Sequence, residues 1–99
     1  MRAAAVGQLK RTIEEVVRDR IGDAIVESVE VLEDADSEGD AILRVRVVFD
    51  SSQGRPDTRE VAGLVRHLRL RLDAEQEPRF PLMSFVSRKD VRKLSPEAA

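Results

Sequence analysis

Apolar residues recur at two different spacings along the chain, and the change from one to the other predicts the order of its elements. Between about Ala3 and Arg20 they fall three or four positions apart, which is the spacing of one helix face. Residues 26–32 and 42–49 instead alternate apolar with polar side chains, as half-buried strands do. The loop between them, residues 34–40, is polar and contains a glycine. We therefore expect a helix followed by an antiparallel hairpin.

The second half of the chain repeats the helix spacing and adds one more strand. A helix is expected from about Asp57 to Asp73, because its apolar positions form a single stripe and Asp57 with Glu60 resembles a capping box. Residues 75–81 read as a polar connection. A strand is expected over 82–86, followed by a short helix capped by Ser87.

The predicted fold is one α+β domain covering residues 1–99, in the order helix–strand–strand–helix–strand with a short C-terminal helix. Two helices are expected to pack on one face of a small mixed three-stranded sheet. Residues 1–2 and 95–99 are expected to be frayed.

Composition restricts the core and the chemistry. The chain has 99 residues with three Phe, no Trp or Tyr and no Cys, so the core must be aliphatic and cysteine chemistry is absent. No segment has the length and apolarity of a membrane span, and no leader peptide is recognisable, so we expect a cytoplasmic protein that does not bind membranes. The excess of Arg over Lys suggests a GC-rich bacterial genome.

Charge is distributed unevenly along the chain. The net charge of −2 combines −5 in residues 1–50 with +3 in residues 51–99. Such a division favours oriented contacts with a partner, although a charged surface is most often only solvated.

Candidate catalytic and metal-binding residues are few. Asp34, Asp36, Glu38 and Gly39 match the first half of a calcium loop, but Val45 stands where the bidentate Glu belongs, so we expect a solvated turn and no metal. The single histidine, His67, lies off the apolar stripe of its helix and is expected to be an ordinary exposed residue. We predict no catalytic residue and no cofactor, hence no enzyme.

The outward face of the second long helix is the candidate partner-binding surface. At about 100° per residue the apolar stripe centres on Leu64, Leu68 and Leu72. The opposite face then carries a basic and small-residue set with one leucine: Arg59, Ala62, Gly63, Arg66, Arg69 and Leu70. Arginine and an exposed apolar anchor are typical of interfaces, and small residues allow close approach. The alternative is a solvated face with one scattered surface leucine.

A second basic group lies near the C-terminus, at Arg88, Lys89, Arg92 and Lys93. Together with Arg66 and Arg69 it is a candidate nucleic-acid footprint. The near absence of aromatic residues and the eight acids between Asp23 and Asp40 disfavour that interpretation.

The order of the elements resembles a minimal KH-type or ribosome-binding-factor-A-like domain. The residues concerned are a leading helix, the segments 26–31 and 43–49, and then a helix and a last strand. This resemblance implies RNA or ribosome association, but the G-x-x-G loop is missing and no RNA-contacting residue carries over. The Arg-rich helix around 61–68, with the strand-like segment 80–87, is also similar to small uncharacterised bacterial proteins. That likeness implies a short chain that accompanies a larger one, as in toxin–antitoxin-like pairs.

Two functions are thus expected from the sequence. The first is a protein-interaction domain without catalytic activity, acting as an accessory or regulatory subunit of a larger bacterial partner or as a self-associating homo-oligomer. The second is a KH-like domain that binds RNA or the ribosome. The sequence does not identify a partner.

Overall fold

Two long helices and a three-stranded sheet form the body of the protein. The computed structural model describes residues 6–94, so the expected frayed ends, 1–2 and 95–99, lie outside it. Helix α1 runs from Val6 to Ile21 and α2 from Thr58 to Ala74. The helix expected from Ala3 to Arg20 therefore extends one residue further at its C-terminal end, where buried Ile21 joins the core and Gly22 follows with a φ of 120°.

Helix α2 begins with the capping box that the sequence predicts. The Asp57 carboxylate accepts a hydrogen bond from the Glu60 amide at 2.8 Å, and the Glu60 carboxylate accepts one from the Asp57 amide at 3.1 Å. Both bonds satisfy amide groups that a helix N-terminus leaves without a partner. These two bonds fix the first turn of α2.

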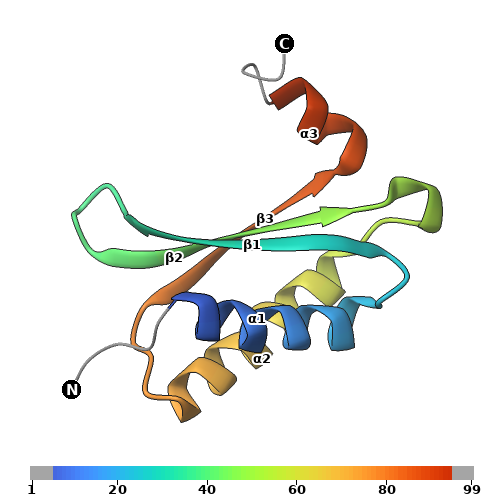
Figure 1. Ribbon diagram of the computed structural model, residues 1–99. Helices are drawn as coiled ribbons and strands as arrows, with labels where there is room; N and C mark the ends of the chain where they lie inside the picture. The colour runs from blue at the N-terminus through green and yellow to red at the C-terminus, as the bar shows by residue number, and fades with distance from the viewer. Residues whose placement is uncertain (1–5, 95–99) are drawn as a thin grey trace.

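The sheet is mixed and has the order β1–β2–β3 (Figure 1). Strands β1 (Val26–Ala35) and β2 (Ala41–Phe49) are antiparallel, and β2 and β3 (Phe80–Ser87) are parallel. A short 3-10 turn, Ser51–Gln53, follows β2. This confirms the predicted α+β fold and its mixed sheet.

Two strand boundaries differ from those predicted by more than one residue, and β2 begins and β3 ends one residue outside the predicted spans. Strand β1 continues past Leu32 to Ala35, since Asp34 and Ala35 still pair with Ile42 and Ala41, so the hairpin loop is shorter than 34–40. Strand β3 begins at Phe80, inside the expected polar connection, because Pro81 is buried and pairs with Leu43. A proline is tolerated there because β3 is an edge strand.

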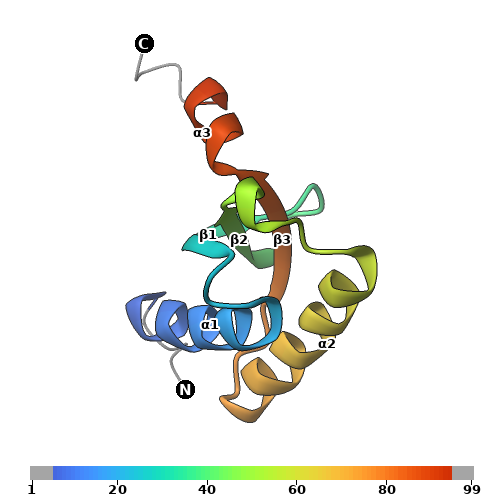
Figure 2. The ribbon, with the colours of Figure 1, turned by 90° about the vertical axis from the view of Figure 1, so that its right-hand side faces the viewer.

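The two long helices cover the same face of the sheet, and the short helix α3 (Arg88–Leu94) lies on the other side (Figures 1 and 2). Its first turn is held by Ser87, whose hydroxyl oxygen accepts a hydrogen bond from the Asp90 amide at 3.2 Å. Figure 2 shows α1 beneath β1 and β2, and α2 displaced towards and beyond β3. The β3 edge therefore has a helix beside it.

The core is mainly aliphatic, as the composition predicts, and Phe49 adds one buried aromatic side chain. Leucine, isoleucine and valine side chains from α1, α2 and the inner face of the sheet form one cluster, with Met83 and Phe85 of β3 packed against it. Leu64, Leu68 and Leu72 bury the predicted stripe of α2. No helix among residues 6–94 has both the length and the apolar character needed to cross a bilayer.

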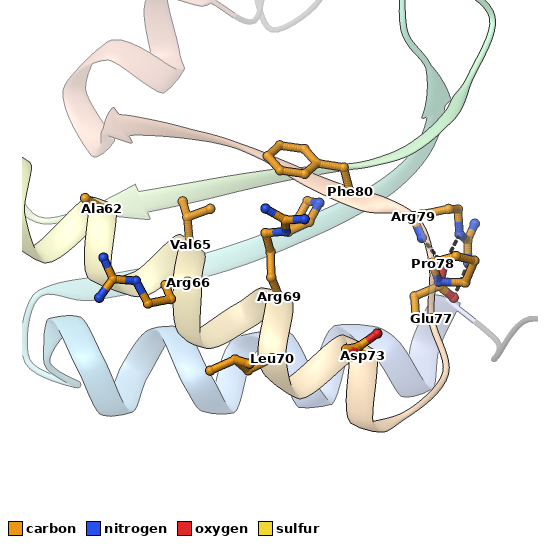
Figure 3. Close-up of a pocket in the computed structure, with 11 residues that line it drawn as sticks. Ala62, Val65, Arg66, Arg69, Leu70, Asp73, Glu77, Pro78, Arg79 and Phe80 are labelled. Carbon is orange, nitrogen blue, oxygen red and sulfur yellow. Dashed lines mark hydrogen bonds and ion pairs between the residues drawn. The ribbon is translucent and has the colours of Figure 1, made fainter.

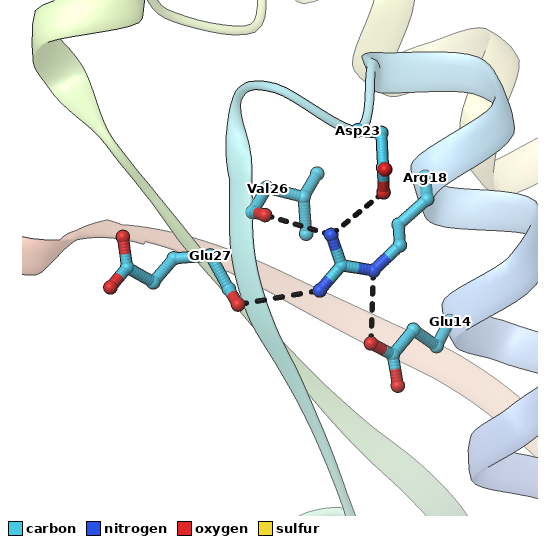
Figure 4. Close-up of polar contacts among 5 residues, drawn as sticks. All are labelled: Glu14, Arg18, Asp23, Val26 and Glu27. Atoms are coloured by element: carbon cyan, nitrogen blue, oxygen red, sulfur yellow. Dashed lines mark hydrogen bonds and ion pairs between the residues drawn. The ribbon is translucent and has the colours of Figure 1, made fainter.

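Arg18 joins the end of α1 to the start of β1 (Figure 4). Its guanidinium donates to the Glu14 and Asp23 carboxylates, both at 2.9 Å, and to the Val26 and Glu27 carbonyls at 2.9 and 3.3 Å. The bond to Glu14 is the main cause of the raised pKa of Arg18, and burial opposes it. One side chain thus fixes the angle at which the chain enters the sheet.

Candidate functional site

The outward face of α2 is arranged as the helical spacing predicts. Leu70 is 63% exposed, whereas its neighbour Leu68 is completely buried. Gly63 is half-buried. The other four predicted interface residues are exposed: Arg59, Ala62, Arg66 and Arg69. The helical phase assigned from the sequence is therefore confirmed.

A groove of about 560 Å³ separates α2 from the start of β3 and the connection before it (Figure 3). We call it the α2–β3 groove. It contains four of the six predicted interface residues but neither Arg59 nor Gly63. Its lining comprises Ala62, Val65, Arg66, Arg69, Leu70, Asp73, Glu77, Pro78, Arg79, Phe80 and Pro81.

The strand wall of this groove is held by a buried ion pair. Glu77 is only 5% exposed, and its two carboxylate oxygens accept from the Arg79 guanidinium at 2.7 and 3.1 Å. Arg79 also lies 3.4 Å from the carboxylate of Glu33 on β1. Hydrogen bonding from Arg79 lowers the pKa of Glu77, against the opposite effect of burial. The pair fixes the short connection between α2 and β3, and this connection places Phe80 beside the groove.

The groove is lined by both cationic and apolar groups. The Arg69 guanidinium carbon lies 5.3 Å from the centre of the Phe80 ring, within the range of a cation–π contact (Figure 3). Within residues 6–94, neither Arg66 nor Arg69 has a carboxylate within 4.0 Å. Asp73 is the acid on the α2 wall. The groove thus presents, beside an aromatic ring, two cations that pair with no carboxylate of residues 6–94.

Leu70 also borders a second groove, which lies between α1 and α2 and measures about 610 Å³. His67 lines this second groove and is exposed, as expected. Arg71 donates to the Glu15 carboxylate at 2.7 Å and ties the two helices together nearby. Leu70 therefore forms part of the ridge that separates the two grooves.

The C-terminal basic group does not join the arginines of α2. Arg88 pairs with Glu27 on β1 at 3.3 Å and Lys89 is exposed, while the side chains of Arg92 and Lys93 lie outside the part of the chain that is described. Helix α3 stands on the opposite side of the sheet from α2 (Figure 2). Arg66 and Arg69 therefore belong to a different face of the molecule.

Two acids of the 34–40 segment, Asp34 and Asp36, are engaged within the hairpin itself. The Asp36 carboxylate accepts from the amides of Glu38 and Asp40, both at 2.9 Å. Asp34 pairs with Arg44 at 2.6 Å, and this bond lowers the pKa of Asp34. Among residues 6–94 there is no group of three or more metal-binding side chains.

The residues that sequence reasoning missed are those of the strand wall, from Glu77 to Phe80. Their only sequence signal was the polar, proline-containing composition of the connection, which indicated a loop and gave no reason to place it opposite Arg69.

Comparison of the chain with protein-family models, curated protein sequences and solved structures finds no significant match.

Proposed function

We propose that this chain is a protein-interaction domain that binds its partner through the outward face of α2 and the α2–β3 groove. The observation that carries this proposal is the exposed Leu70, which lies between two grooves on a face that also presents Arg66 and Arg69. In this proposal the chain supplies a docking surface and no chemistry of its own, as an accessory or regulatory subunit would.

Three features support a protein partner at this surface. Leu70 is an apolar anchor, and covering it would contribute about 1–2 kcal/mol. Arginine beside an apolar anchor is the composition of interface hot spots. Ala62 is exposed, and its small side chain allows another chain to approach α2 closely at the groove.

The test is affinity capture from the source cells with the full chain and two matched variants. Ala62→Arg fills the groove, and Ala24→Arg adds the same charge at an exposed position in the turn before β1. We expect a nuclease-resistant protein partner to be retained by the wild-type chain and by Ala24→Arg, and lost with Ala62→Arg.

Two results would contradict the proposal. Retention of the same proteins by Ala62→Arg would show that binding does not use the groove. Capture that disappears after nuclease treatment would favour the KH-like alternative, in which RNA is the ligand. Circular dichroism of both variants establishes that each remains folded.

A further inference from the structure

The two edges of the sheet differ in charge. Strand β1 carries four carboxylates along its length: Glu27, Glu30, Glu33 and Asp34. Strand β3, from Phe80 to Ser87, has no charged side chain. Charged residues on an edge strand normally discourage pairing with other chains. The β1 edge has this protection, and the β3 edge lacks it.

The outer edge of β3 has no backbone partner in the described part of the chain. Strand β3 pairs only with β2, and the backbone hydrogen bonds outside the helices and strands involve none of residues 80–87. Pro81 removes one amide donor near the start of the strand. The residues after it leave a row of outward amides and carbonyls, which is a template for one more strand.

Helix α2 provides the second wall of a binding site at this edge. It runs beside β3 with the α2–β3 groove between them (Figures 2 and 3). A strand added to β3 would direct alternate side chains towards this groove. Those side chains would meet Val65 and Leu70, which are apolar, and the guanidinium groups of Arg66 and Arg69.

We propose that the partner contributes an extended acidic segment, which pairs with the free edge of β3 as a fourth strand and places carboxylates against Arg66 and Arg69. This inference rests on the function proposed above and specifies the partner. Other arginines nearby already have carboxylates, Arg71 with Glu15 and Arg79 with Glu77, whereas these two have none in residues 6–94. Main-chain pairing would supply affinity, and the arginines would select acidic sequences.

A second copy of the chain does not fit this site if it binds by pairing its own β3 with the β3 edge. Twofold pairing of two β3 strands would continue the sheet and place two α2 helices side by side on the same face. Arg66 and Arg69 of both copies would then face each other, β3 would contribute no acid between them, and each α2 wall would supply only Asp73 against two arginines. Like charges opposed in this way disfavour association.

The experiment is a selection of random twelve-residue peptides, displayed on phage, against the full chain. The tightest peptide is then synthesised in a series with one amide N-methylated at a time, and its dissociation constant is measured by fluorescence anisotropy. We expect acidic peptides, and at least a tenfold loss of affinity on methylation at alternate positions only, because alternate amides of an added strand face β3.

Charge reversal tests the selectivity. The double variant Arg66→Glu, Arg69→Glu is expected to weaken binding at least tenfold, whereas Arg11→Glu, an exposed arginine on α1, should leave the affinity unchanged. Circular dichroism verifies that each variant is folded. Selected peptides without an excess of acids, or affinity that charge reversal does not change, would overturn the acidic partner.

The outcomes separate this inference from the function on which it rests. If Ala62→Arg abolishes peptide binding but methylation has no alternating effect, the groove is a docking site and strand addition is wrong. If peptides bind Ala62→Arg as tightly as the wild-type chain, both are wrong. If no peptide is enriched, the inference fails, and the capture experiment still decides the proposed function.

Discussion

Glu77 is the most completely buried charged residue among those whose side chains the structure describes, and its ion pair with Arg79 makes stability depend on pH. Hydrogen bonds from Arg79 hold the pKa of Glu77 below its usual value of 4.5. A carboxylate whose pKa is lower in the folded than in the unfolded state stabilises the fold above the unfolded pKa. That contribution disappears as the pH falls through the folded pKa.

We therefore expect Glu77→Gln to lower the free energy of unfolding by on the order of 1 kcal/mol at about pH 7, and by less at about pH 3. Urea denaturation at both pH values measures the difference. The matched control is Glu38→Gln, which makes the same change of side chain at an exposed position of the hairpin turn. An equal loss of stability at both pH values for Glu77→Gln would show that the ion pair makes no pH-dependent contribution to the free energy of unfolding.

Gly63 occupies the interior of α2 with open space around it. A Cβ added there meets no atom within 4 Å in the described part of the chain, which therefore gives no packing reason for a glycine. Glycine in a helix interior is less favourable than alanine by roughly 0.5–1 kcal/mol. We expect Gly63→Ala to stabilise the protein by about that amount in thermal or urea denaturation.

The control for Gly63→Ala is Gly39→Ala in the hairpin turn. Gly39 has a φ of 85°, which an L side chain rarely adopts, so the same substitution should destabilise there although space is equally open. Destabilisation by Gly63→Ala would mean that α2 is strained at this position.

At the scale of the element, α2 has two leucines close in sequence with opposite roles. Leu68 is completely buried and Leu70 is 63% exposed. Leu68→Ala is expected to cost about 2–5 kcal/mol of stability because it leaves a cavity, whereas Leu70→Ala should change stability by about 0.5 kcal/mol or less. Denaturation curves of the two variants decide this, and a large loss for Leu70→Ala would place it in the core.

Helices and hairpin could be predicted from the sequence because their signals are local. The stripe of α2, the capping box at Asp57 and the alternation in residues 42–49 lie within a few residues of the features they specify. The ends of β1 and β3 could not be predicted in this way. The residues at the end of β1 and at the start of β3 become strands through pairing across the sheet, as Asp34 with Ile42 and Pro81 with Leu43 do.

The candidate site divides along the same line. The α2 wall could be assigned from helical spacing, which placed Ala62, Arg66, Arg69 and Leu70 on one face. The strand wall could not, because the contact of Arg69 with Phe80 depends on how the chain returns after α2. The difference in charge between the two halves of the chain could be read from the sequence. Which sheet edge carries charged side chains could be assigned only from the strand order.

At the scale of the whole molecule, the strand order places β2 between two partners and leaves β1 and β3 with no further strand on their outer sides in residues 6–94. Strand β2 also has the most complete burial, with Leu43, Val45 and Val47 all at 0% exposure. Helix α3 is only seven residues long and stands apart from the α1 and α2 layer (Figure 1). Stability should therefore decrease from the centre of the sheet towards α3.

Amide hydrogen exchange measures this gradient directly. Amides of β2 should exchange last, by opening events that approach global unfolding, because both of their edges are paired and their inner side chains are buried. Amides of α3 should exchange first, since a helix of two turns with little tertiary packing is marginal on its own. In β3, the amides that point away from β2 should exchange faster than those bonded to it, and an added acidic strand should slow only the outward set.

Protection of α3 equal to that of β2 would contradict the gradient. Slow exchange of the outward β3 amides in the free protein would mean that this edge is already covered, which would leave no room for a fourth strand.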